Sequence, residues 1–312
     1  MITTVTLNPA IDKTYRIREL KCGRIHRVQQ VTEAPGGKGI NVAKVLHRLG
    51  QQVVATGLIG GYNGQRICHL LDEMHINHDF CRVSGESRLC LNMIDDQGVG
   101  TEVLEPGPAI SPAEWKRMKD KCADLAKQSS FVVFSGSLPL GLDQSAYQQL
   151  VHLVQQSGAK AVLDTSGAAF RAALDACPFM VKPNLDEVRQ ILGANMLTRE
   201  EIGQVIQEWH QHGVEWIAVS LGAEGAIVSR RDAGAWLAIP PQIEAVNPVG
   251  SGDSFVAGFV AGLAEHRSLE ECIQWAVACG AANALEERAG EIVPDRIREF
   301  NPQVKLVRLS IT

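Results

Sequence analysis

Short apolar runs that favour β-strands alternate with longer helical patterns through most of this chain. The helical patterns cover 40–49, 113–128, 144–156 and 199–212. Strands that are separated by helices must cross over and run parallel, so the alternation predicts an α/β fold whose mainly parallel sheet is covered by helices on both faces. The strand-like runs are 3–7, 53–58, 131–135, 161–164, 179–182 and 216–220.

Two segments, 14–32 and 82–104, break this alternation with polar, alternating strand patterns and turns such as Asp96-Gln97-Gly98. They predict a small sheet outside the main one. A lid that excludes water from a binding site and a simple extension of the sheet edge both fit this spacing. Because no linker divides the chain, residues 1–312 are predicted to form one domain with a discontinuous lid from about 14–32 and 82–104.

Composition excludes several partners. The formal net charge is −5 and basic residues form no run, so we expect no nucleic-acid partner. The eight cysteines include no CxxC pair, which indicates reduced thiols. The first residues lack a signal-peptide pattern, and no apolar run is long enough to span a bilayer, so we expect a cytoplasmic protein without a membrane partner.

Residues 247–254 carry the strongest chemical signal. They read Asn-Pro-Val-Gly-Ser-Gly-Asp-Ser and precede an apolar helical run. The first amides of a helix lack internal partners and lie at the positive end of its dipole, so they bind anions. Asp253 on the same turn can take a proton from a hydroxyl, with an ordinary pKa well below neutral, which predicts phosphoryl transfer to an alcohol. The anion site would consist of the amides of Gly250, Ser251 and Gly252.

A second glycine-rich segment, 35–41, opens the first helical pattern. Gly36 and Gly37 permit close backbone approach to a ligand, Lys38 can meet a phosphate, and Asn41 offers a donor and an acceptor to sugar hydroxyls. It is not a Walker A loop, because no Ser or Thr follows the lysine. A plain glycine-rich turn before a helix is the alternative interpretation.

Other candidates follow strand-like runs. Asp12 can bind two sugar hydroxyls or cap a turn, and Ser137 can border the sugar. Arg88 and Arg27 can neutralise an acceptor phosphate, although most arginines are only solvated.

The segment around Lys182 offers Asn184 and Glu187, which are three residues apart. Their oxygens can hold magnesium through water, or form a helix capping box, or both. Ser220, Gly222 and Gly225 form a turn that borders a nucleotide or is a tight hairpin.

Residues 36–43 and 247–254 together resemble the two signatures of the ribokinase-like sugar kinases, the phosphofructokinase B family. The resemblance covers nearly the whole chain. Within the family, the chain resembles the branch of tagatose-6-phosphate kinase and 1-phosphofructokinase. Segments 85–88, 101–108 and 163–168 favour the tagatose-6-phosphate side. Many relatives have Asp-Thr where this chain has Asn247-Pro248, which places in doubt any monovalent-cation site known from the family.

The resemblance implies a three-layer sandwich with a small β-sheet lid, a homodimer through that lid, and a kinase that uses ATP and Mg²⁺. The implied acceptor is a ketohexose phosphate: tagatose 6-phosphate, or alternatively fructose 1-phosphate. It implies that Asp253 is the base. It also implies that the sugar is contacted by Asp12, Gly37, Asn41 and Ser137, and its phosphate by Lys38 and Arg88. The residues implied on the nucleotide side are Lys182, Asn184, Glu187, Ser220, Gly222, Gly225 and Asn283, with Asn283 near the adenine.

Two other classes of function remain as alternatives. A dinucleotide-dependent oxidoreductase fits the sheet type, but 250–252 lacks a third glycine and follows a late strand. A non-catalytic sugar-phosphate sensor has no use for the acid at Asp253.

Overall fold

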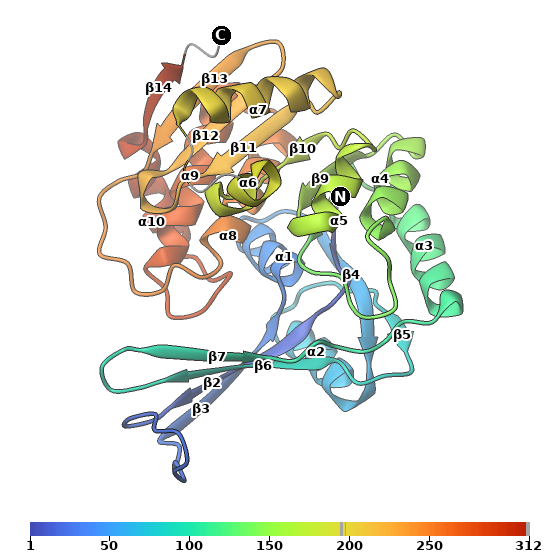
Figure 1. Ribbon diagram of the computed structural model, residues 1–312, viewed down its shortest axis with the longest axis vertical. Helices are drawn as coiled ribbons and strands as arrows, with labels where there is room; N and C mark the ends of the chain where they lie inside the picture. The colour runs from blue at the N-terminus through green and yellow to red at the C-terminus, as the bar shows by residue number, and fades with distance from the viewer. Residues whose placement is uncertain (194–195, 197, 310–312) are drawn as a thin grey trace.

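The computed structural model describes residues 1–193, 196 and 198–309. Within these residues the main sheet has ten strands (Figure 1). Its order is β14-β13-β12-β11-β10-β9-β8-β1-β4-β5, parallel from β11 to β5 and antiparallel from β11 to β14. The predicted mainly parallel sheet is confirmed. The strands are β1 Ile2–Thr6, β4 Val53–Gly60, β5 Cys81–Val83, β8 Phe131–Ser135, β9 Lys160–Asp164, β10 Met180–Val181, β11 Trp216–Ser220, β12 Ala226–Arg230, β13 Gly234–Ile239 and β14 Lys305–Leu309.

Alternate residues of each strand pack into two different cores. In β8, Phe131 and Val133 join one core, whereas Val132 and Phe134 join the other. Helices cover both faces, so the predicted three layers are present. The first face carries α1 Lys38–Arg48, α2 Gly61–Glu73, α8 Ser251–Ala264, α9 Leu269–Ala284 and α10 Pro294–Phe300. The second carries α3 Pro112–Ala126, α4 Ala146–Gln156, α5 Gly167–Leu174, α6 Leu185–Leu192 and α7 Arg199–Gln211.

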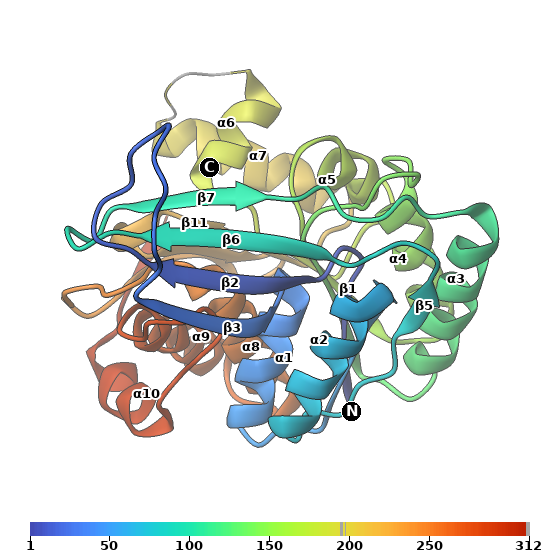
Figure 2. The ribbon, with the colours of Figure 1, turned by 90° about the horizontal axis from the view of Figure 1, so that it is seen from below.

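A second sheet of four strands, here called the small sheet, lies along one side of the molecule (Figure 2). Its order is β3-β2-β6-β7, and β2 runs parallel to β6. The strands are β2 Ala10–Arg16, β3 Gln30–Gly36, β6 Arg88–Ile94 and β7 Gly100–Leu104.

The small sheet differs from the predicted ranges 14–32 and 82–104 at its boundaries. β2 begins at Ala10, four residues before the predicted start. Its first two residues are apolar, and Ile11 is buried in the main core, so this part of the strand lacks the polar alternation on which the prediction depended. Arg82 and Val83 belong to β5, which pairs with β4 at the edge of the main sheet.

Glycines let α1 pack directly on the end of β1. Gly37 has φ 106°, and a Cβ there would lie 2.8 Å from Cγ2 of Thr6. A Cβ on Gly39 would lie 2.4 Å from Oγ1 of the same threonine. The N-terminus of α1 is therefore fixed at the carboxyl edge of the parallel strands, where α/β sheets bind ligands.

No helix within the described residues has both the length and the apolar character needed to cross a membrane.

Candidate active site

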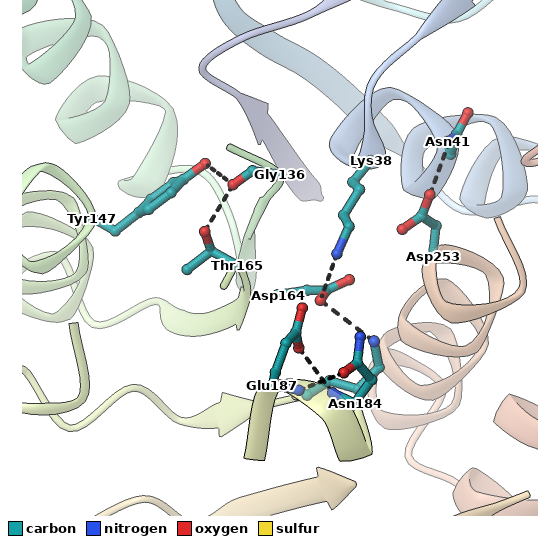
Figure 3. Close-up of polar contacts among 10 residues, drawn as sticks. Lys38, Asn41, Gly136, Tyr147, Asp164, Thr165, Asn184, Glu187 and Asp253 are labelled. Carbon is teal, nitrogen blue, oxygen red and sulfur yellow. Dashed lines mark hydrogen bonds and ion pairs between the residues drawn. The ribbon is translucent and has the colours of Figure 1, made fainter. Parts of the chain in front are cut away.

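Asp253 lies in the first turn of α8 and is only 6% exposed. Its Oδ2 accepts a hydrogen bond of 2.8 Å from Nδ2 of Asn41 on α1, so the two glycine-rich segments meet here (Figure 3). Burial, with the negative charge of Asp164, raises the pKa of Asp253 to about 7, although Lys38, Asn41 and Lys182 oppose this rise. The expectation of an ordinary low pKa is therefore wrong, because the sequence pattern did not reveal how deeply this carboxyl is buried.

A second buried carboxylate, Asp164, ends β9 beside this site. Its Oδ1 is 3.3 Å from Nζ of Lys38 (Figure 3). The same oxygen is 3.4 Å from Nζ of Lys182. Burial opposes its ionisation, but the two lysines outweigh that effect and hold the pKa of Asp164 below its ordinary value. The ion pair with Asp164 also raises the pKa of Lys38, so these two groups keep their charges at neutral pH.

Asp164 is not among the site residues that the sequence motifs predict. A signal was present, because an acid that ends an apolar strand-like run lies at the ligand-binding edge of a parallel sheet. Oδ2 of Asp164 is buried and has no hydrogen-bond partner among the described residues, so one oxygen remains available to a ligand.

The loop before α8 presents open amides. Gly250 has φ 86°, which favours glycine, and a Cβ there would lie 2.8 Å from Cβ of Ala289. Ser251 N donates to Pro248 O at 3.2 Å, whereas the amides of Gly250, Gly252 and Asp253 have no recorded partner within the described chain. The predicted trio of amides is thus corrected: Ser251 is engaged in the turn, and the first amides of α8 that remain open are those of Gly252 and Asp253.

Lys182 lies over this loop. A Cβ added to Gly252 would lie 3.1 Å from its Nζ, so the glycine lets the ammonium group, which is 3.4 Å from Oδ1 of Asp164, lie close to the backbone of the loop. Open amides and a buried ammonium group together make this region suitable for a phosphate group.

Asn283 supports the loop from behind. It is fully buried, its Oδ1 accepts from Ser254 Oγ at 3.0 Å and from Gly290 N at 2.8 Å, and its Nδ2 donates to Val249 O at 2.9 Å. Its amide is used within the protein, so the position gives no support to the expected contact with adenine.

Asn184 and Glu187 form the capping box that the sequence analysis considered. Asn184 N donates to Glu187 Oε2 at 2.8 Å, and Glu187 N donates to Asn184 Oδ1 at 2.7 Å. Burial raises the pKa of Glu187, although the Asn184 amide and Lys38 oppose this.

The oxygens around this cluster fit a cation that is held mainly by water and phosphate. No group of three metal-ligating side chains is present among the described residues. Oδ2 of Asp164 is nevertheless free, and Glu187 lies near enough to Asp164 for their charges to interact. This set suits magnesium, which usually keeps several waters and takes one or two carboxylates.

Asp12 lies on β2, where Gly36 accommodates its carboxyl group. A Cβ on Gly36 would lie 2.2 Å from Cγ of Asp12, so no other residue fits there without moving the acid. Burial raises the pKa of Asp12, while Lys44 and Arg88 oppose the rise.

Arg88 and Ser137 both lie near Asn8 at the end of β1. Arg88 Nε donates to Asn8 O at 3.1 Å, and Asn8 Nδ2 lies 3.5 Å from Oγ of Ser137. Arg27 is not part of this group, because it lies exposed between β2 and β3.

The nucleotide-side turn is a hairpin between β11 and β12. Gly225 has φ 101°, and a Cβ there would lie 2.0 Å from Ala238 O, so packing explains this glycine. Ser220 donates its amide to Pro183 O at 3.0 Å, next to Asn184, while Gly222 is exposed. A nucleotide contact for this turn stays a prediction.

Comparisons with known proteins identify the family of this chain. Residues 5–296 match the family described as pfkB family carbohydrate kinase. The chain is 36% identical over 312 residues to tagatose-6-phosphate kinase from Staphylococcus epidermidis, an alignment that covers 99% of this chain and 100% of that protein.

Solved structures show the same fold. Phosphofructokinase-2 from Escherichia coli in complex with fructose-6-phosphate has a TM-score of 0.87 at 26% identity, and its tetrameric inhibited form has a TM-score of 0.90 at 27% identity; each covers 97% of this chain and 98% of that chain. Ribokinase from Arabidopsis thaliana, complexed with ribose and ATP, has a TM-score of 0.81 at 22% identity over 96% of this chain and 98% of that chain, which supports the ribokinase-like fold alone. The acceptor class is an alcohol group, and the chain belongs to the pfkB family of carbohydrate kinases.

Proposed function

We propose that this chain transfers the γ-phosphoryl group of ATP to tagatose 6-phosphate and so forms tagatose 1,6-bisphosphate. The observation that carries the proposal is the position of Asp253, a buried acid at the positive end of α8 beside Asn41 and two lysines. The relative from Staphylococcus epidermidis, matched over its whole length, supports this choice of sugar.

Asp253 is the proposed general base. Asn41 holds Oδ2, which leaves Oδ1 to take the proton of the attacking sugar hydroxyl. The sugar oxygen then bonds to the γ-phosphorus, and the bond from that phosphorus to the β–γ bridging oxygen breaks to release ADP. A pKa of about 7 suits this role, because a base works best when its pKa lies near the operating pH.

Positive groups around the base stabilise the transferred phosphoryl group. Lys182 and the open amides at the start of α8 face the same region, and they are fixed before the reaction begins. Magnesium bound with ATP would neutralise phosphate charge; Asp164 would hold it through its free oxygen, and Asn184 and Glu187 through water.

The acceptor would lie between the small sheet and α1. Asp12 and Asn41 would bind its hydroxyls, aided by close approach at Gly36 and Gly37 and by Ser137. Lys38 and Arg88 would bind its phosphate, and Arg27 is a weaker candidate because it lies apart. Ser220, Gly222 and Gly225 would border the nucleotide.

We further propose a homodimer through the small sheet. Its outer strands leave apolar side chains exposed: Val31 is 51% exposed, Val103 49% and Leu104 58%. Val31 on β3 and Val103 on β7 lie at opposite edges of the sheet, but the pairing register places both on one face, whereas Leu104 points to the other face. Exposed apolar groups on one open sheet favour contact with a second copy.

The test of the sugar is a comparison of kcat/KM for tagatose 6-phosphate, fructose 6-phosphate and fructose 1-phosphate with ATP and Mg²⁺. We expect tagatose 6-phosphate to lead fructose 1-phosphate by at least about tenfold, the scale set by one or two misplaced polar contacts. A lead for fructose 1-phosphate would make the chain a 1-phosphofructokinase. Tight binding of all three without turnover would favour a sensor.

A further inference from the structure

Lys44 carries a buried ammonium group that the proposed transfer does not use. It lies one turn beyond Asn41 on α1 and is 5% exposed. Its Nζ donates to Asn41 Oδ1 at 3.3 Å and to Ala289 O at 2.5 Å. A buried lysine is rare unless it is paired, so these two contacts need an explanation.

The contact with Asn41 determines which way the amide of that residue faces. An ammonium group only donates, so it requires the amide oxygen on its own side. The amide nitrogen must then face Asp253, which it does at 2.8 Å. Lys44 thus selects the orientation in which Asn41 donates to the carboxylate of Asp253.

The contact with Ala289 fixes a turn between the two glycine-rich segments. A Cβ on Gly290 would lie 2.9 Å from Cα of Asn41, and a Cβ on Gly250 would lie 2.8 Å from Cβ of Ala289. The turn at 289–290 is therefore packed between α1 and the loop before α8, and Lys44 holds it from the α1 side.

We propose that Lys44 is a positioning residue for phosphoryl transfer, which keeps the Asn41 amide donating to Asp253 and the turn at Ala289 in place beside the anion loop. This inference rests on the proposed function, because it assigns Lys44 a role toward the base of that reaction.

Several charged groups surround Lys44 and Asp253, and they determine in which direction the pKa of Asp253 should shift when Lys44 is replaced. Asp12 on β2, Glu291 and Arg288 after α9, and Asp253 on α8 face Lys44, and burial lowers its pKa. Asp253 is faced by Asp164, Lys38, Lys182 and the Asn41 amide.

Loss of Lys44 raises the pKa of Asp253 in two ways. A nearby positive charge disappears, and the Asn41 amide becomes free to turn its oxygen toward the carboxyl group, which favours the protonated acid. The base is then available only at higher pH.

The experiment compares Lys44→Met with Lys44→Arg, using kcat/KM between pH 5.5 and 9.5 on whichever sugar phosphate the wild type prefers. We expect the acidic limb of Lys44→Met to move up by about one pH unit, a loss of about tenfold at pH 6.5 that recovers to within about threefold at pH 9. Lys44→Arg keeps the positive charge, so its acidic limb should stay at the pH of the wild type. An unmoved limb in Lys44→Met would overturn the proposal, whatever the loss in kcat, because both proposed effects of Lys44 act on the pKa of Asp253.

Two further measurements test the role of the Asn41 amide and the pKa of Asp253 separately. In an Asn41→Leu background the amide is absent, so adding Lys44→Met should shift the limb less than it does alone; an equal shift would contradict the role of the amide. Carbon-13 NMR of the Asp253 carboxyl, assigned with Asp253→Asn, reports the same pKa without turnover. It therefore tests Lys44 even if the wild type phosphorylates none of the three sugars. Should Lys44→Met not fold, Lys44→Gln is read in the same way.

Discussion

The two helix N-termini at the candidate active site and the small sheet beside them are held in different ways. Asp253 and Asn41 are buried between α1 and α8, where glycines bring backbones into contact. The small sheet is open: every residue of β6 is partly exposed, and every residue of β7 is exposed. The proposed base is thus preorganised by the core, whereas β7, in the sheet that carries Asp12, is exposed along its whole length.

Close packing of α8 against α9 depends on small residues, since a Cβ on Gly258 would lie 2.7 Å from Sγ of Cys279. Asp253, in the first turn of α8, is buried as well, and its burial disfavours the charged form and raises its pKa. The packed region therefore holds the proposed base in place but loses some stability at neutral pH, where the buried carboxyl group ionises. The exposed strand β7 of the small sheet buries no such group.

The strongest test of the packed region is Asp253→Asn. We expect kcat to fall by roughly two to four orders of magnitude, the scale of a lost general base, with little change in KM for the sugar. Steady-state kinetics with ATP and Mg²⁺ measures this. A variant that keeps near-wild-type turnover would remove Asp253 from the role of base.

Thermal stability supplies the control for that variant. The folded pKa of Asp253 lies above its unfolded value, so its contribution to stability is present at low pH and is lost as pH rises from about 4 to about 7. Asp253→Asn removes a buried group that must ionise, and its Tm at pH 8 should equal or exceed that of the wild type. A lower Tm would indicate that the kinetic loss includes misfolding.

The sequence predicted the packed region better than its electrostatics. Glycines next to Asp253 and Asn41 mark helix N-termini, so local pattern was sufficient to find both residues. Asp164 and Lys38 lie 126 residues apart, and Lys44 and Ala289 lie 245 residues apart, so their contacts depend on folding and not on spacing. The raised pKa of Asp253 follows from burial, which no motif reports.

A second test addresses the junction of the two regions with Gly36→Ala. The new Cβ would lie 2.2 Å from the Asp12 carboxyl, which must move away from its place. We expect kcat/KM for the sugar phosphate to fall by about tenfold to a hundredfold, mainly through KM, because a misplaced polar contact costs about 1–3 kcal/mol. Gly100→Ala on the same sheet is the control, since its Cβ meets only the Asn92 side chain at 3.3 Å. Equal effects of both variants would argue against a sugar contact at Asp12.

The charge coupling inside the packed region is tested by Asp164→Asn. Removal of this negative charge takes away one cause of the raised pKa of Asp253 and frees Lys38 to stabilise its carboxylate. The acidic limb of kcat/KM, expected near pH 7 in the wild type from the raised pKa of Asp253, should move down by about half a pH unit, in the direction opposite to the shift expected for Lys44→Met. Asp96→Asn in the turn of the small sheet should leave the limb in place. An unmoved limb in Asp164→Asn would mean that the two carboxyl groups do not interact.

The smallest effect on turnover is expected from the open region, where Leu104→Asp places a charge on the exposed strand β7. If the small sheet joins two copies, the charge would have to be buried in the interface, and light scattering should show a monomer where the wild type is a dimer. Because Asp253 is held by the core and not by this sheet, kcat should change by only about threefold or less, while KM for the sugar rises. Val307→Asp is the control, since that side chain is 47% exposed on β14 at the edge of the main sheet. A wild type that is monomeric at micromolar concentration, or a Leu104→Asp variant that stays dimeric, would place the dimer contact elsewhere or exclude it.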